Sequence, residues 1–284
     1  MIKIDLLFPE GRKKAVTFSY DDGVKSDLHI MEEAYKYGIK CTFNINSEGE
    51  TIPDLTLNES CRRLTADELK AVYSSSSHET AIHTLTHPYL KDIPVPSAVS
   101  EIINDRRNLE RILHKPVLGL AYPFNSYNAD ILEALRLSGV RYARTTIPTK
   151  GYSLPDDWLQ WNPTCGDIAP ESDGLINRFI GETPICGAWL MYLWGHSYIY
   201  ELKNRWKDFS DICKKLGNNS DIWYASNIEI YNYANAYKNL IFDVDCTFAY
   251  NPTPYRIWLE IRNDWVFDKS TVLAIEPGQQ INLV

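Results

Sequence analysis

The chain has 284 residues, of which 44% are hydrophobic and 23% charged, enough to bury the core of one large domain. Lys and Arg number 29 against 37 Asp and Glu, so the net charge is -8, and no basic cluster exceeds the short stretch at residues 11–14. This composition excludes intrinsic disorder, and the charge balance lacks the electrostatic pattern of a nucleic-acid binder.

Six cysteines are spread along the chain without a CxxC pair. In a chain of this size we expect free, mostly buried thiols rather than disulfides or zinc ligands. The most apolar run, residues 188–194, is far shorter than the roughly 20 residues of a membrane-spanning helix. The first residues show no secretory-signal pattern. We therefore expect a cytoplasmic protein without nucleic-acid or membrane partners.

Short β-rich runs alternate with helical periodicity, which is typical of an α/β fold with a mainly parallel sheet. In the first half, apolar residues at helical spacing predict a helix between Val24 and Gly38. Thr65 and Glu68 form a capping-box pattern, which predicts a helix that ends in the serines 74–77. The other predicted elements of this half are strands at 15–20, 41–45, 81–83 and 117–122 and a long helix at about 96–114.

The alternation continues to about residue 240 and makes about seven strand-helix units. Residues 147–170 contain four prolines and are expected to form a long loop over one rim. Beyond residue 240, alternating apolar residues predict a small antiparallel β segment. The other predicted elements are helices at 129–137, 172–180, 201–216 and 229–237 and strands at 142–146, 188–194 and 222–225.

Asp21 and Asp22 follow the predicted strand 15–20. Neighbouring side chains in a strand point to opposite faces, so adjacent carboxylates share a pocket only where the strand ends, and Gly23 supplies that freedom. One carboxylate can then bind a metal while the other stays free. The alternative interpretation is a turn in which both aspartates cap the next helix.

Two further strand ends carry histidines. His83 and His87 lie four residues apart on a predicted strand-to-loop turn, and His196 ends the apolar strand 188–194. Two imidazoles and one carboxylate leave metal positions open for water and substrate, as in a catalytic zinc site. Hydrogen-bonded loop histidines are the alternative. In α/β barrels, the carboxyl ends of the strands form the active-site rim.

Four segments, in order, resemble motifs of the polysaccharide deacetylases, also called carbohydrate esterase family 4 or the NodB homology domain. Residues 17–23 (TFSYDDG) look like the first motif, and residues 83–87 (HTLTH) are similar to the second, H-(S/T)-x-x-H. Residues 121–125 (AYPFN) resemble the third motif and residues 193–196 (LWGH) the fifth. The resemblance spans about two thirds of the chain.

The resemblance implies a distorted seven-stranded (β/α) barrel over residues 1–240, with 241–284 as a small β-rich C-terminal extension. It implies Asp21 as general base and His196 as acid. The implied cofactor is a divalent metal, zinc first, with cobalt, nickel or iron as alternatives. The implied metal ligands are Asp22, His83 and His87, and the implied oxyanion or substrate-binding residues are Phe124, with its backbone N–H, Tyr122, Pro123, Trp194 and Trp161.

The sequence departs from the family pattern in the third motif, where Asn125 also stands in place of the usual Gly, and in the fourth. Ala121 stands where the third motif often has an Arg that orients the catalytic Asp. Arg144, near the end of the next predicted strand, is a candidate replacement, and an Arg at the rim of the core is the alternative reading. The fourth motif, an Asp-Trp element, has no clean match. The candidates for it are Asp156-Asp157-Trp158, or Trp161 with Asp167.

The resemblance implies a metal-dependent hydrolase that removes N-acetyl or O-acetyl groups from a sugar or oligosaccharide, and the residues present suit that reaction. One alternative on the same fold is hydrolysis of another non-peptide C–N bond, in a cyclic amide or ureide. A catalytically silent carbohydrate-binding barrel and a metal-free glycosidase with two carboxylates are further alternatives. The sequence leaves the sugar, its linkage and the oligomeric state open.

Overall fold

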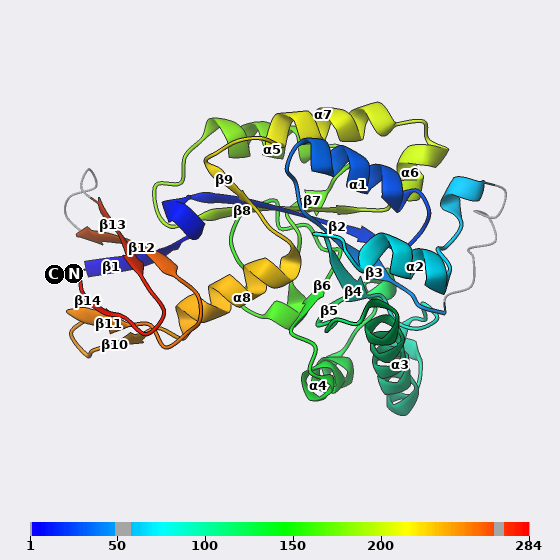
Figure 1. The fold of residues 1–284 in the computed structure, drawn as a ribbon, viewed down its shortest axis with the longest axis horizontal. Coiled ribbons are helices and arrows are strands. Elements are labelled where there is room, and N and C mark those ends of the chain that lie inside the picture. The colour runs from blue at the N-terminus through cyan, green and yellow to red at the C-terminus, as the bar shows by residue number, and fades with distance from the viewer. Residues whose placement is uncertain (1, 49–57, 264–269, 284) are drawn as a thin grey trace.

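The computed structural model describes residues 2–48, 58–263 and 270–283 (Figure 1). Its centre is a parallel sheet in the order β6-β5-β4-β3-β2-β8-β7, and β9 pairs with the start of β2. The predicted α/β fold is confirmed, as a curled seven-strand parallel half-barrel with additional small strands. Its strands are β2 (Lys14–Asp21), β3 (Cys41–Ile45), β4 (Glu79–Ile82), β5 (Gly119–Ala121), β6 (Tyr142–Arg144), β7 (Cys165–Gly166), β8 (Trp189–Gly195) and β9 (Ile222–Tyr224).

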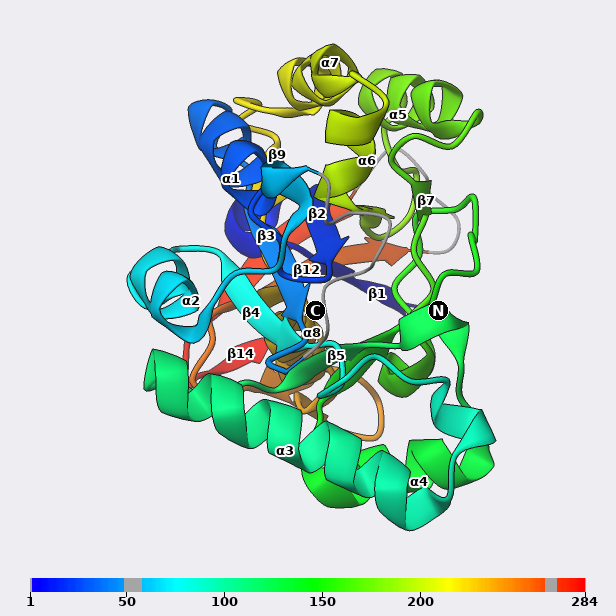
Figure 2. The same cartoon turned by 90° about the vertical axis from the view of Figure 1, so that its right-hand side faces the viewer.

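The helices lie around the outside of the curled sheet, with α5 and α7 at the top and α3 and α4 at the bottom of both views (Figures 1 and 2). The predicted capping box at Thr65 is present, with Glu68 bonded back to the cap. The helices are α1 (Asp27–Lys36), α2 (Ala66–Tyr73), α3 (Val95–Leu113), α4 (Ala129–Ser138), α5 (Ser172–Gly181), α6 (Ser197–Leu202), α7 (Trp206–Leu216) and α8 (Asn227–Lys238). Short 3-10 helices are η1 (Pro9–Gly11), η3 (Glu59–Cys61), η4 (Leu90–Asp92), η5 (Pro123–Asn125) and η6 (Trp158–Gln160).

The prediction of one helix over residues 201–216 is wrong. The chain forms α6 and α7 with a break between them, where Asn204 has a left-handed φ of 50°. The N–H of Arg205 donates to the carbonyl of Tyr200 at 2.8 Å, which closes α6 before α7 begins. Asn tolerates this backbone conformation better than most residues, so the periodic pattern runs across a real interruption.

The long loop predicted over residues 147–170 is also corrected. Its second half connects the two edges of the curled sheet, because Trp161 forms a parallel bridge with Arg144 of β6 and β7 then pairs with β8. The N–H of Thr164 donates to the carbonyl of Tyr192 at 2.8 Å. These contacts are too short and too interrupted by prolines to produce a strand pattern in the sequence.

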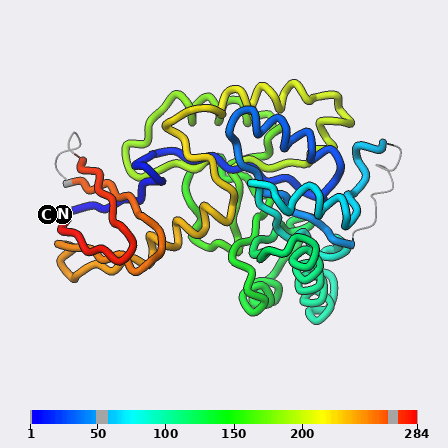
Figure 3. The backbone as a smooth tube through the Cα atoms, viewed as in Figure 1, coloured from blue at the N-terminus to red at the C-terminus, as the bar shows by residue number. Residues whose placement is uncertain are grey.

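Strands from both chain ends gather at one end of the molecule (Figures 1 and 3). β1 (Ile2–Leu7), which the sequence pattern did not predict, pairs antiparallel with β12 (Ile257–Asn263), and β12 pairs with β13 (Ser270–Ile275). A second small sheet consists of β10 (Ile241–Phe242), β11 (Phe248–Tyr250) and β14 (Gln280–Asn282). We propose that this β-rich unit comprises residues 241–284 together with β1.

The core explains the position of the site. β2 is buried from Ala15 to Asp21, since it lies inside the sheet with both faces covered. Its last buried residue is therefore a carboxylate at the rim. All six cysteines are free thiols and four are buried, as expected. Within the described residues, no helix is both long enough and apolar enough to cross a bilayer.

Candidate active site

The carboxyl ends of β2, β4 and β8 and the turn after β5 surround one pocket of about 360 Å³. This volume is within the range of small-molecule sites, roughly 300–1,000 Å³. The pocket is lined by Asp21, Asp22, His83, His87, Tyr122, Phe124, Thr146, Trp194, His196 and Tyr198. The structure thus brings together most of the site residues that were predicted from separate strand ends.

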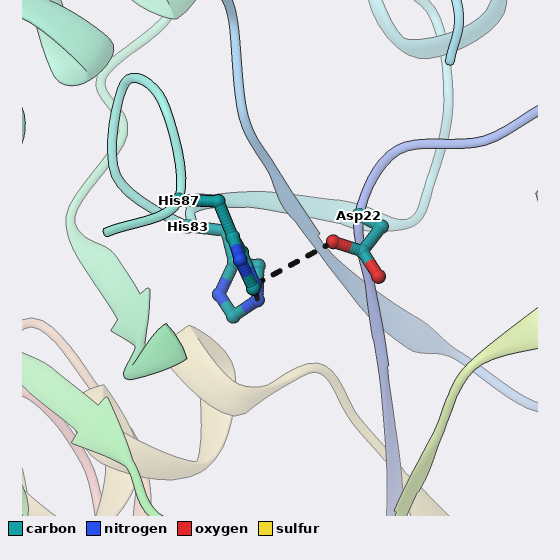
Figure 4. Close-up of side chains that lie close together, drawn as sticks. All are labelled: Asp22, His83 and His87. Carbon is teal, nitrogen blue, oxygen red and sulfur yellow. Dashed lines mark hydrogen bonds and ion pairs between the residues drawn. The ribbon is translucent and has the colours of Figure 1, made fainter. Parts of the chain in front are cut away.

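Asp22, His83 and His87 form a cluster whose ligand atoms all lie within 4.8 Å of one another. The two histidines come from the loop after β4 and face Asp22, which directly follows β2 (Figure 4). Their Nε2 atoms are 3.2 Å apart, and Nε2 of His87 is 3.7 Å from Oδ1 of Asp22. Two nitrogens bound tetrahedrally to zinc, each about 2.0–2.1 Å from it, would be roughly 3.3 Å apart. The donor set and its spacing therefore fit a divalent metal.

The hydrogen bonds of His83 prepare its ring for metal binding. Its Nδ1 lies 2.8 Å from the carbonyl oxygen of Ala121, so Nδ1 carries the proton and the lone pair of Nε2 faces the cluster. Burial lowers the pKa of His83 to about 4, and burial also lowers the pKa of His87. Both rings are neutral near pH 7, as metal ligands must be.

Helix α3 holds the histidine loop in place. The backbone N–H of His83 donates to the Asp105 carboxylate at 3.1 Å, and the backbone N–H of Thr86 donates to Glu101 at 2.8 Å. The backbone of His87 has a φ of 65° and that of Asp22 a φ of 83°. Non-glycine residues rarely adopt these left-handed angles, which concentrate at functional sites.

Asp21 is held by two side chains from neighbouring strands. Arg144 Nη2 donates to both of its carboxylate oxygens, and Asn44 Nδ2 donates to Oδ1 at 2.8 Å. Burial raises the pKa of Asp21, but Arg144, His83 and His196 outweigh it and bring the pKa to about 2. Arg144 is fully buried, with its guanidinium 4.6 Å from the Trp194 ring. Arg144 thus makes the contact with Asp21 that was suggested for it because Ala121 stands in place of the usual Arg.

His196 faces both carboxylates from the end of β8. Its Nε2 lies 3.8 Å from Oδ2 of Asp21 and 3.8 Å from Oδ2 of Asp22, and its side chain is 28% exposed. Asp167 is packed against Gly195, where an added Cβ would lie 2.6 Å from the carboxylate oxygens. Any other residue at position 195 would displace this carboxylate.

The two candidates for the fourth motif lie in different places. Asp167 is beside the site: its N–H donates to the carbonyl of Trp194 at 2.9 Å, and burial raises its pKa to about 6. Asp157 instead caps η6 by accepting from the N–H of Leu159, and Trp158 packs on Tyr231. Proximity therefore favours Asp167.

Of the other predicted site residues, some line the pocket and others are buried away from it. Tyr122, Phe124 and Trp194 line the pocket. Pro123 is buried and does not belong to the pocket lining. Trp161 is 1% exposed and packs on Tyr192 in the core. Trp161 therefore does not line the pocket.

Several residues around the site escaped the sequence analysis. Asn44 lies near the end of the predicted strand 41–45 and Asn46 directly follows it, so their position at a strand end was a usable signal. Tyr198 follows His196 by two residues, and its ring is 5.1 Å from the imidazole. Arg63 donates to Oδ1 of Asp22 at 3.3 Å from a segment that carries no motif, and no pattern indicated it.

A curled parallel half-barrel with two imidazoles and a carboxylate at its rim, and a second carboxylate beside them, presents the set of groups that metal-assisted hydrolases use. Residues 9–143 match the family model "Polysaccharide deacetylase". The resemblance found in the sequence is confirmed, and the similarity to the polysaccharide deacetylase family covers just under half of the chain. The matched residues include Asp21, Asp22, His83 and His87.

Solved structures share the fold. A Mycobacterium smegmatis protein assigned to the polysaccharide deacetylases aligns with a TM-score of 0.59 at 16% identity, over 82% of this chain and 94% of its own. The Xyl-CE4 domain of a multidomain xylanase from the hindgut metagenome of Trinervitermes trinervoides aligns with a TM-score of 0.52 at 13% identity, over 79% of this chain and 92% of its own.

A third structure, the Streptococcus pyogenes deacetylase PplD in complex with acetate, is 23% identical with a TM-score of 0.43, over 51% of this chain. The alignment spans 61% of that protein's chain. No curated protein matches the sequence significantly. At these identities the structural comparisons show the fold.

Proposed function

We propose that the protein is a metal-dependent hydrolase that removes N-acetyl or O-acetyl groups from a sugar or oligosaccharide. The observation that carries the proposal is the arrangement around Asp21. An ionised carboxylate, fixed by Arg144 and Asn44, lies beside the donor set of Asp22, His83 and His87. The match of residues 9–143 to the polysaccharide deacetylase family model supports the acetyl group as the part removed.

Asp22, His83 and His87 would hold the cation, with zinc expected first and cobalt, nickel or iron as alternatives. When bound there, a divalent cation would polarise the acetyl carbonyl and make a water molecule more acidic. The neutral imidazoles and the ionised carboxylate suit this ligand role at neutral pH.

Asp21 would accept the proton of the attacking water molecule. Its low pKa keeps it ionised throughout the neutral range, and Arg144 fixes the direction of its carboxylate. The backbone N–H of Phe124 is proposed to donate to the developing oxyanion, a contribution usually worth about 10²–10³ in rate. His196 would donate a proton to the departing amine or alkoxide, which is a poor leaving group without it.

The walls of the pocket support a sugar as the substrate. Tyr122, Phe124, Trp194 and Tyr198 present aromatic rings around the polar cluster, and the Phe124 side chain is 52% exposed. Aromatic faces match the apolar faces of pyranose rings, and the polar cluster would meet the acetyl group.

The cytoplasm remains the predicted compartment, which cell fractionation can test.

The test is acetate release from a panel of N- and O-acetylated mono- and oligosaccharides, with metal-loaded protein and a chelated control. The proposal expects release that chelation abolishes and that added metal restores. Metal-bound protein without acetate release would contradict it, and cyclic amides and ureides would then be assayed on the same preparation. Protein that binds sugar but binds no metal and releases no acetate would indicate a catalytically silent barrel.

A further inference from the structure

Residues 58–64 form a segment that pairs with the turn after β2. Arg63 makes an antiparallel bridge with Val24, and the N–H of Leu64 donates to the carbonyl of Gly23 at 2.9 Å. The N–H of Lys25 donates to the carbonyl of Arg62 at 2.8 Å. This pairing directs the Arg63 side chain, which is 9% exposed, to Asp22.

The Arg63 guanidinium contacts three acceptors at the edge of the candidate metal site. Nη1 donates to the backbone carbonyl of Asp22 at 2.7 Å, and Nη2 donates to Oδ1 of Asp22 at 3.3 Å. Nη1 also donates to Oδ1 of Asn46 at 2.5 Å. One side chain therefore holds both the backbone and the carboxylate of Asp22.

Asn46 extends these contacts to the histidine loop. Its Nδ2 donates to the carbonyl of His83 and, at 2.8 Å, to the carbonyl of Thr84. Thr84 has a left-handed φ of 66° and Asp22 a φ of 83°. The Arg63 guanidinium and the Asn46 amide thus join two backbone segments whose left-handed conformations are unfavourable by themselves. Asn46 is 5% exposed, so its amide contacts lie inside the protein.

We propose that Arg63 and Asn46 are positioning residues, which hold Asp22 and His83 in the relative geometry that binds the metal. The inference rests on the proposed function, because it assigns these two residues to the same site. Hydrogen-bond partners of metal ligands fix ligand orientation, and their loss typically costs about 10–100-fold in metal affinity or activity. The planar fork of an Arg can hold several acceptors at fixed angles, which a Lys ammonium cannot do equally well.

The first experiment measures Co²⁺ binding to metal-free full-length protein, by competition with a chromophoric chelator and by the visible absorption of bound Co²⁺. Arg63→Met should weaken binding about 10–100-fold and change the absorption bands, because the ligands lose their orientation. Arg63→Lys should recover part of the affinity.

Arg62→Met is the matched control. Arg62 lies in the same segment but pairs with Glu59 and Glu68, away from the pocket. Its substitution removes two ion pairs of similar kind, so Co²⁺ affinity and spectrum should match those of the wild type. A loss in Arg62→Met as large as that in Arg63→Met would show that disturbing the segment is enough, and would overturn the proposal.

Asn46→Ala tests whether the two residues act as one unit. If they do, the double variant should bind Co²⁺ no more weakly than the weaker single variant, since neighbours in one network are not additive. Independent losses that multiply would contradict the joint role. Should Arg63→Met fail to fold by circular dichroism, Arg63→Lys and Asn46→Ala carry the test.

Unchanged Co²⁺ affinity and spectrum in folded Arg63→Met would overturn the proposal, even if the variant unfolds at a lower temperature. Failure of the proposed function gives a different result. In that case wild-type protein would bind Co²⁺ no better than His83→Ala, and all variants would be alike. Tight wild-type binding that His83→Ala weakens but the Arg63 and Asn46 variants do not would overturn this inference and leave the proposed function standing.

Discussion

Two polar clusters lie at opposite ends of the parallel sheet, and they are built differently. At the amino end, Glu79 accepts hydrogen bonds from the Tyr142 hydroxyl at 2.6 Å, the Thr42 hydroxyl at 2.9 Å and the N–H of Ile228 at 2.8 Å. At the carboxyl end, His87 and His196 face the carboxylates at 3.7–3.8 Å. The polar groups of the first cluster are paired with one another, whereas the second cluster leaves space between imidazoles and carboxylates that a cation and substrate can use.

The backbone differs in the same way. Thr42, Glu79 and Tyr142 lie within regular strands. Asp22, His87 and Phe124 all have φ values between 53° and 83°. Left-handed backbone at non-glycine residues costs of order 1–3 kcal/mol each and persists where the surroundings enforce it. The comparison indicates that the carboxyl end is organised for chemistry and the amino end for stability.

The largest effect is expected from removing a metal ligand. His87→Ala should lose bound metal and acetate release together, by about 10³-fold or more, since a bound cation contributes several kcal/mol to catalysis. Elemental analysis and the acetate assay measure the two losses. His29→Ala is the control, because His29 stacks on Trp206 outside the pocket. Retained metal and activity in His87→Ala would remove this histidine from the site.

Asp21→Asn separates proton transfer from metal binding. The amide keeps the shape of the side chain but cannot accept the proton, so kcat should fall about 10²–10⁴-fold. Metal content should stay at the wild-type level because Asp21 is not assigned as a ligand. Full turnover in this variant would show that the base lies elsewhere.

Arg144→Met tests the ion pair that holds the base. We expect kcat to fall about 10–100-fold, as for other partners that orient active-site groups. Without the guanidinium the pKa of Asp21 should rise above about 2, so activity should be lost at a higher pH on the acid side. The pH profile of kcat measures this, with Arg144→Lys as the conservative variant. If the kcat of Arg144→Met fell at the same acid pH as that of the wild type, the expected effect of Arg144 on the pKa of Asp21 would be contradicted.

The smallest effect on activity is expected at the amino end. Burial raises the pKa of Glu79 from 4.5 to about 7, so the folded protein favours the neutral carboxyl. Its contribution is fully present below pH 4.5 and is lost as the pH rises through about 7, which amounts to at most about 3 kcal/mol. Glu79→Gln should remove this pH dependence and leave acetate release unchanged.

Urea unfolding at pH 4, 6 and 8 measures the difference between wild type and Glu79→Gln. Relative to Glu79→Gln, the unfolding free energy of the wild type should fall as the pH rises from 4 to 8. The kcat of the variant should equal that of the wild type. A large loss of activity in this folded variant would mean that the two ends of the barrel are coupled, and the contrast between them would fail.

Much of the fold could be predicted from the sequence because the determining signals are local. The alternation of strands and helices and the Thr65–Glu68 capping box depend on residues a few positions apart. The placement of Asp21, Asp22, His83 and His196 at strand ends follows from the same local pattern. Their chemical roles remain predictions that the variants above test.

Other features depend on residues far apart in the chain. β1 has a strand partner only because β12 lies beside it, more than 250 positions later. Residues 161–166 connect β6 to β8 through a few backbone hydrogen bonds, which leave no periodic pattern. Trp161 resembled a pocket residue by its neighbours in sequence, but packing against Tyr192 buried it in the core.

The sequence by itself determined which positions carry carboxylates and imidazoles at the ends of buried strands, because strand ends are set by local hydrophobic patterning. Only the tertiary structure decided which of these groups meet. The order of strands in the sheet brings Arg144 to Asp21, and the pairing of residues 58–64 with the turn after β2 brings Arg63 to Asp22. Contacts of this kind depend on the three-dimensional path of the chain, and no spacing in the sequence encodes them.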